Sequence, residues 1–139
     1  MKLPTLMVAD GARSGPDGKL YIFGGQWDKI FAVQVPTTQP IALAMVIDVG
    51  YDEALRPHTC RVTFRWEDGE PFGPGLQFQM QFGHPPGLKP GASFSFPVAV
   101  DAQSVPLDRY GRFEVIVELD DEPAGTRVLE VLRSPLLPQ

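Results

Sequence analysis

Alternation of apolar and polar residues with a period of two is the feature of this chain that most constrains its fold. The alternating segments are 59–66, 76–82, 94–100 and 113–119. Successive side chains of a β-strand point to opposite faces of the sheet, so this pattern buries one face of each strand and exposes the other. It predicts an all-β protein, more specifically a single-domain antiparallel β-sandwich of eight or nine strands with an immunoglobulin-like or jelly-roll topology.

Turn-forming residues divide the rest of the chain into further short strands. The 15 prolines and 14 glycines are spread over the whole sequence and leave no window for an amphipathic helix. We expect the segment 101–110 to hold a single helical turn at most, and the stretch 84–91, rich in Pro and Gly, to be a loop. The remaining predicted strands are 3–10, 19–24, 28–35, 41–49 and 126–133.

Length and cysteine content are typical of a single reduced domain. The 139 residues are expected to form one domain, 1–139, with residues 134–139 as a flexible tail. Cys60 is the only cysteine, and its position on the apolar side of a strand predicts a buried thiol. The chain shows no export signal and no apolar run of the ~20 residues that span a bilayer. These features predict a bacterial cytoplasmic protein.

The charge balance argues against two classes of partner. The chain carries 17 acidic and 12 basic residues, a net charge of −5, and its basic residues are thinly spread. Nucleic acids and anionic membranes attract clusters of Lys and Arg. We therefore expect neither as a partner.

Two early strands are apolar on both faces instead of one. These are the segments 19–23 and 41–47. Such strands are covered on both sides, either by loops and termini of the same chain or by another subunit. The second alternative predicts a subunit interface formed by Tyr21, Phe23, Ala44 and Val46.

The polar face of the central strands is a candidate binding surface. If 59–66 and 76–82 pair as a hairpin, their outward side chains form a flat layer of amide and guanidinium groups. This layer serves either as an ordinary soluble face or as a binding site for a small molecule, a glycan or a protein. Its candidate binding residues are Arg61, Arg65, Gln77, Gln79 and Gln81. A separate candidate is Trp27, in a loop beside two glycines, whose ring either caps the core or contacts a ligand.

Catalytic and metal-binding patterns are weak in this sequence. His58 and His84 are the only histidines, and neither stands in the spacing of a zinc site or beside a serine in a nucleophile elbow. The acids of the segment 120–122 form a turn that either binds calcium or is simply solvated. We predict no cofactor, no resident metal and no enzymatic activity.

Several motifs resemble those of an uncharacterised family of small all-β bacterial proteins. The resemblance rests on Ala9-Asp10-Gly11-Ala12, on the turn, strand and break from Asp17 to Trp27, and on the segments 83–88 and 109–113. It implies a shared fold and transfers no catalytic residue. Each motif residue also has a structural role: Gly24 and Gly25 permit a bend, and we expect Leu20 and Ile22 to pack inward.

These observations together predict a non-enzymatic protein-interaction or structural module that associates with a protein partner or with itself. The alternative is a carbohydrate-type ligand-binding sandwich that uses the Gln/Arg face or Trp27. The amino-acid pattern does not identify the partner or the ligand.

Overall fold

The protein is built almost entirely from β-strands. The computed structural model describes residues 1–135, except for the side chain of Gln103, so most of the predicted tail lies outside the described residues. The strands are β1 Lys2–Ser14, β2 Leu20–Gly25, β3 Lys29–Ala32, β4 Thr37–Gly50, β5 Pro57–Trp66, β6 Pro71–Gln81, β7 Ser93–Leu107, β8 Gly111–Leu119 and β9 Glu122–Arg133. The all-β prediction is confirmed.

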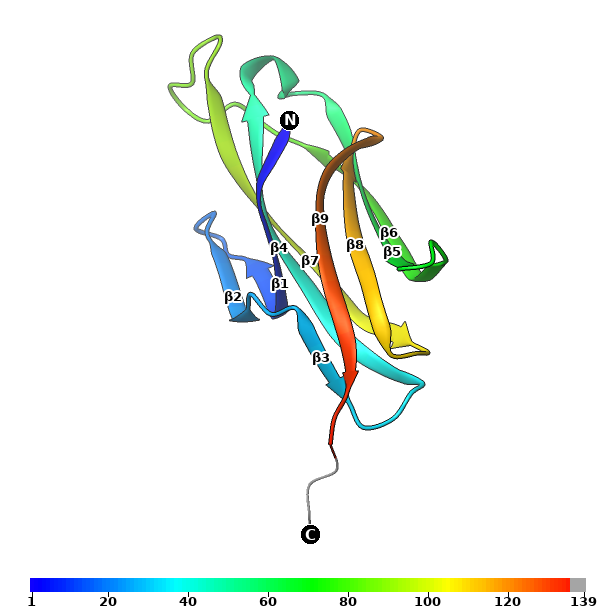
Figure 1. Ribbon diagram of the computed structural model, residues 1–139. Helices are drawn as coiled ribbons and strands as arrows, with labels where there is room; N and C mark the ends of the chain where they lie inside the picture. Colours follow the sequence, from blue (N-terminus) through cyan, green and yellow to red (C-terminus); the bar gives the residue numbers. More distant parts are fainter. Residues whose placement is uncertain (136–139) are drawn as a thin grey trace.

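The strands form two curled sheets around one core (Figure 1). Sheet A has the order β2-β1-β4-β7, and sheet B has the order β3-β9-β8-β5-β6. In strands such as β5 and β8 the core takes every second side chain, as the alternation predicts, whereas β2 contributes none. Cys60 lies in it, completely buried, and burial raises the pKa of its thiol to about 11.

One strand pair differs from the predicted antiparallel arrangement. β3 pairs with β9 in parallel, from Lys29 opposite Glu130 to Ala32 opposite Arg133. The pair continues past the strands, because Ser134 donates its N–H to the Ala32 carbonyl at 2.9 Å. A pairing between segments about a hundred residues apart leaves no mark on local periodicity, so the sequence pattern did not reveal it.

The expected helical turn in 101–110 is wrong. β7 continues to Leu107 and pairs with β4 from Ser93 to Ala102 and again, after a shift in register, from Val105 to Leu107. Cross-strand pairing therefore prevails over the local turn signal. A 3₁₀ turn forms instead at Tyr51–Glu53, and among residues 1–135 no helix is long and apolar enough to cross a membrane.

Candidate interaction surface

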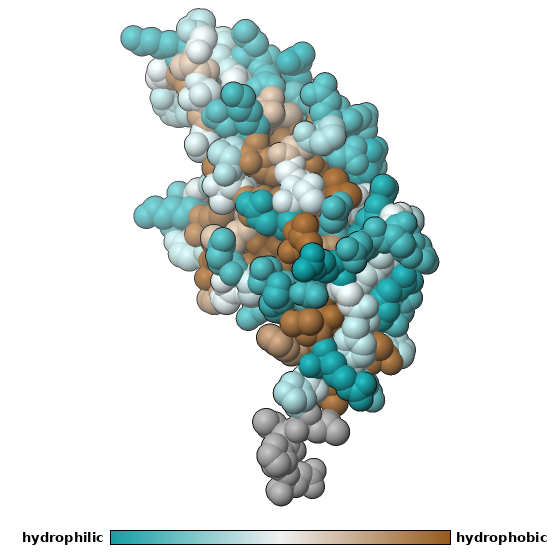
Figure 2. All heavy atoms as spheres, viewed as in Figure 1, coloured by the Kyte–Doolittle hydropathy of each residue, from teal (hydrophilic) through white to brown (hydrophobic). Residues whose placement is uncertain are grey.

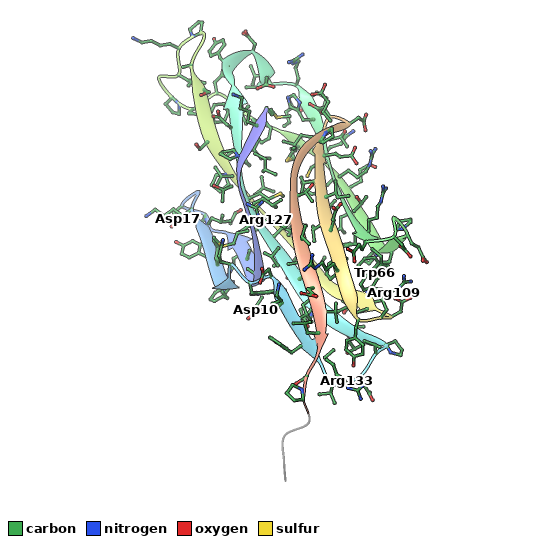
Figure 3. The ribbon with its side chains drawn as sticks, viewed as in Figure 1. Asp10, Asp17, Trp66, Arg109, Arg127 and Arg133 are labelled. Carbon is green, nitrogen blue, oxygen red and sulfur yellow. The ribbon has the colours of Figure 1, made fainter. Side chains whose placement is uncertain are left out.

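The second half of β1 leaves β4 and pairs with β2 instead, as a hairpin at the edge of sheet A. β1 pairs with β4 from Lys2 to Ala9, and with β2 from Ala9 to Ser14. We call residues 10–25 the hairpin arm. Figure 1 shows the arm at the side of sheet A with its tip near the loop between β6 and β7, and Figure 3 labels Asp17 at the tip and Asp10 near the base.

A glycine at the base of the arm permits this geometry. Gly24 has φ +55°, a left-handed conformation that residues with a side chain rarely adopt. A Cβ atom at this position would also collide with the carboxylate of Asp10. The bend expected at Gly24 is therefore present, and it sets the direction of β2.

The outward face of sheet A carries three alanines that are completely buried. Ala9, Ala42 and Ala44 alternate with core residues such as Leu43 and do not belong to the core cluster themselves. The arm lies over this face, since β2 contacts β7 although β1 and β4 separate these strands in the sheet. The apolar outward side of β4 is thus covered by the same chain and not by another subunit.

β2 itself remains uncovered. Tyr21 is 44% exposed, Ile22 38% and Phe23 55%. We call these three residues the hairpin patch; in Figure 2, hydrophobic residues gather on the left margin of the molecule at the height of the arm. The inward packing expected for Ile22 is not observed, because the arm stands outside the core.

Polar contacts hold the aromatic rings of the hairpin patch in place. The Tyr21 hydroxyl donates a hydrogen bond to Asp17, which lowers the pKa of the Asp17 carboxyl and raises the pKa of the Tyr21 phenol. The Arg13 guanidinium lies over the Phe23 ring, 5.6 Å from its centroid. Both rings are therefore oriented before any partner binds.

The predicted interface residues divide into two groups. Tyr21 and Phe23 lie on the exposed arm, whereas Ala44 is completely buried beneath it and Val46 is half-buried. All four side chains belong to outward-facing positions in the register of sheet A. Only the two aromatic residues are exposed enough to meet a partner without movement of the arm.

A hollow of about 460 Å³ lies between the arm and the edge of sheet A. Its lining is mainly apolar and includes Gly15, Gly18, His84, Pro85, Phe94 and Phe96. The outline of the molecule in Figure 2 is indented at this point, between the arm and the β6–β7 loop.

His84 has a structural environment. It lies half-buried, its ring stacks on Tyr51 with centroids 4.0 Å apart, and its Nε2–H donates to the Tyr51 carbonyl at 2.9 Å. An acid–base role would require a carboxylate beside the ring. Among the described residues, no group of three or more His, Cys, Asp or Glu is arranged to hold a metal ion.

The outward face of sheet B gathers the predicted Gln/Arg layer. Arg61 stands opposite Gln77, and its Nε–H donates to the Gln77 amide oxygen at 3.3 Å. Its terminal nitrogens pair with Glu118 at 3.5 Å and with Asp121 at 3.0 Å. The other members of the layer, which alternate with core residues and are exposed, are Arg65, Gln77, Gln79 and Gln81.

The donors of Arg61 are thus already used within the protein. Arg65 instead lines a hollow of about 290 Å³ together with Arg112 and Glu114. Ligand binding by this face stays a prediction.

Trp27 caps the sandwich. It is half-buried, packs against the core, and its indole N–H donates to the Gly24 carbonyl at 2.9 Å. This bond satisfies the only polar group of the side chain. Trp27 lies in the loop between β2 and β3, and it does not belong to the Gln/Arg layer on β5 and β6.

The acidic turn between β8 and β9 is tied to β5. Asp120 accepts the Thr59 N–H on Oδ1 at 2.9 Å, and its Oδ2 faces His58 Nδ1 at 2.6 Å. The backbone hydrogen bond and the bond from His58 both lower the pKa of the Asp120 carboxyl, although burial opposes them. Asp121 carries the ion pair to Arg61, so both carboxylates already have protein partners.

A cluster around Arg109 was missed by the sequence analysis. The guanidinium lies 5.0 Å from the ring centroid of the buried Trp66 and pairs with Asp108 at 2.9 Å, Glu70 at 3.2 Å and Asp68 at 3.3 Å. Figure 3 shows Trp66 and Arg109 side by side. Because the partners come from two turns about 40 residues apart, the only local signal was the pair Asp108-Arg109 itself.

Comparison with known proteins gives the chain a family and no activity. No curated protein matches it. One family model matches residues 4–132, which include nearly all of the nine strands and the whole hairpin arm. The chain therefore belongs to a family of unknown function, DUF6941.

Proposed function

We propose that the protein is a non-enzymatic interaction module, an immunoglobulin-like β-sandwich that associates with another copy through the hairpin patch. The observation that carries this proposal is the exposure of two aromatic residues, Tyr21 and Phe23, side by side on one face of a short strand, with Ile22 also exposed on its other face. Exposed apolar residues that lie next to one another mark association sites more often than isolated ones do.

The environment of the patch supports this function. Aromatic residues are enriched at protein interfaces, and the contacts with Asp17 and Arg13 reduce the side-chain entropy lost on binding. The topology supports the fold assignment, because the order β9-β8-β5-β6 in sheet B matches the G-F-C-C′ strand order of variable-type immunoglobulin domains. We place the protein in the cytoplasm.

Light scattering over a concentration series tests this function. We expect the mass of the wild-type protein to rise with concentration and the double variant Tyr21→Ser/Phe23→Ser to stay monomeric. Leu55→Ser is the matched control, because Leu55 is an apolar residue outside the arm that is 59% exposed. A wild-type protein that stays monomeric throughout, or a double variant that associates like the wild type, would contradict the proposal.

A further inference from the structure

The free edge of β2 leaves backbone groups without partners in the described chain. β2 pairs with β1 on one side and has no strand on its other side within residues 1–135. The Lys19 carbonyl accepts the Gly15 N–H at 2.9 Å, so Lys19 points its backbone groups toward β1. Since these groups alternate in direction along a strand, those of Leu20 and Ile22 point away from β1.

The other three sheet edges carry features that discourage strand pairing. β6 contains Pro71 and Pro74, and β7 contains Pro97 and Pro106. β3 is four residues long and begins with Lys29. Proline, charge and shortness are the usual protections of an edge strand, and β2 has neither a proline nor a charge between Leu20 and Gly25.

We propose that β2 pairs antiparallel with β2 of a second copy of the chain, with Ile22 on the two-fold axis. This inference rests on the proposed function and identifies the partner surface. The register makes the uncharged segment 20–24 overlap completely with its copy. It places Tyr21 of each copy opposite Phe23 of the other, so that two cross-strand aromatic pairs form on the exposed face of the arm.

Electrostatics permit this self-association. The chain carries a net charge of −5, which repels a second copy over most of its surface. Residues 10–25 are locally neutral, because the acids Asp10 and Asp17 balance the bases Arg13 and Lys19. The two Lys19 side chains lie at opposite ends of the paired strands, about six residues or ~20 Å apart.

A contact of one short strand and two aromatic pairs is small. Interfaces below about 1,200 Å² are typical of weak, transient association. We therefore expect a dimer with a dissociation constant in the micromolar to millimolar range, which a concentration series detects.

Cysteine cross-linking tests the register. Tyr21 and Phe23 of opposite copies form a non-hydrogen-bonded pair with Cα atoms about 4.5 Å apart, within the range of a disulfide. Under mild oxidation we expect a mixture of Tyr21→Cys and Phe23→Cys to give the linked dimer, whereas each variant alone stays unlinked, because its two cysteines are about 8 Å apart. Cys60 is completely buried and does not interfere.

Ile22→Pro tests the backbone pairing. Proline removes the outward N–H of Ile22 without removing a bond to β1, and edge strands accept proline in this orientation. We expect about a tenfold loss of association, since both Ile22 hydrogen bonds across the axis disappear. Ile22→Val, the matched control, keeps the N–H, and near-ultraviolet circular dichroism checks that both variants fold.

The outcomes separate this inference from the proposed function. One outcome rejects β2 pairing but leaves the proposed function intact. In that outcome the wild type associates, Ile22→Pro associates equally well, and the cysteine mixture gives no cross-link. Cross-linking of Tyr21→Cys with itself overturns the register centred on Ile22. A monomeric wild-type protein overturns the proposed function.

Discussion

His58 joins three segments of the protein at one buried ring. Its Nδ1 faces the Asp120 carboxylate at 2.6 Å, and its Nε2 faces the Glu53 carbonyl at 2.5 Å. The ring thus lies between two oxygen atoms from different parts of the chain. The Glu53 carboxylate in turn binds the N-terminal ammonium group, which ties the start of β1 to the same cluster.

Replacement of Asp120 tests this cluster through its pH dependence. The pKa of Asp120 is lowered in the folded protein, so its stabilisation is present above the ordinary carboxyl pKa of about 3.9 and is lost as the pH falls through the folded value. We expect Asp120→Asn to cost about 1–2 kcal/mol of unfolding free energy at pH 7 and progressively less as the pH falls below about 3.9 towards the folded pKa. Urea unfolding at several pH values measures the difference.

Asp121→Asn is the control for the same turn. Asp120 and Asp121 have φ 51° and 65°, and asparagine tolerates this conformation as aspartate does. If Asp120→Asn loses the same unfolding free energy at pH 3 and at pH 7, the charge of the Asp120 carboxylate contributes nothing to the stability of the protein.

Residue-scale contacts were the least predictable part of the site. The sequence marked His58 as the start of a strand, which is correct, and the acids 120–122 as a turn, of which Asp120 and Asp121 form the turn and Glu122 begins β9. It gave no reason to pair them, because 62 residues separate His58 from Asp120. The orientation of outward side chains on neighbouring strands was easier to predict, since alternation alone determines it.

At the scale of elements, Arg109 connects two turns at one end of the sandwich. It lies between β7 and β8 and pairs with Asp68 and Glu70 from the turn between β5 and β6. Its guanidinium also covers one face of Trp66, whose other face stacks on Phe72 with centroids 4.4 Å apart. The side chain thus closes this end of the core and fixes the position of the neighbouring turn.

Removal of Arg109 should open this end of the core locally. We expect Arg109→Ala to shift the emission of Trp66 to longer wavelength and to speed amide exchange in the segment 67–70, because water reaches the indole and the turn loses its anchor. Trp27→Phe as the background isolates the Trp66 signal. Arg109→Lys keeps the positive charge but loses the planar guanidinium group. If its emission shift and amide exchange change as much as those of Arg109→Ala, the shape of the guanidinium group, and not its charge, closes this end of the core. An unchanged emission spectrum in Arg109→Ala would contradict the model of a closed core end.

The elements themselves were predicted unevenly. Strands in the alternating half of the chain lie where the pattern placed them, because each has one buried and one exposed face. β7 extends further than expected, since its pairing with β4 continues through a segment rich in turn-forming residues. The hairpin arm was read as two ordinary strands, because local sequence does not show that a strand changes partner in its middle.

For the molecule as a whole, the order of strands in the sheets has a kinetic consequence. β1 pairs with β4, β4 with β7, β5 with β8, and β3 with β9, so most of the structure joins strands that are not neighbours in sequence. Closing the intervening loops costs entropy before any contact compensates for it.

We therefore expect slow folding, on the millisecond to second scale typical of β-sandwiches. Stopped-flow tryptophan fluorescence after dilution from urea measures the rate. Repeating the measurement at several protein concentrations separates folding from association. A rate in the microsecond range would contradict the long-range pairing described here.

The parallel pairing of β3 with β9 also affects the order of events during synthesis on the ribosome. β3 leaves the exit tunnel early, and its partner follows about a hundred residues later. At about 5–20 residues per second, this delay lasts roughly 5–20 s, during which β3 has no strand to pair with and Phe31 stays beside an open edge. Completion of sheet B thus depends on the last strand to be made, and a nascent chain that stalls before residue 130 exposes the sheet to other chains.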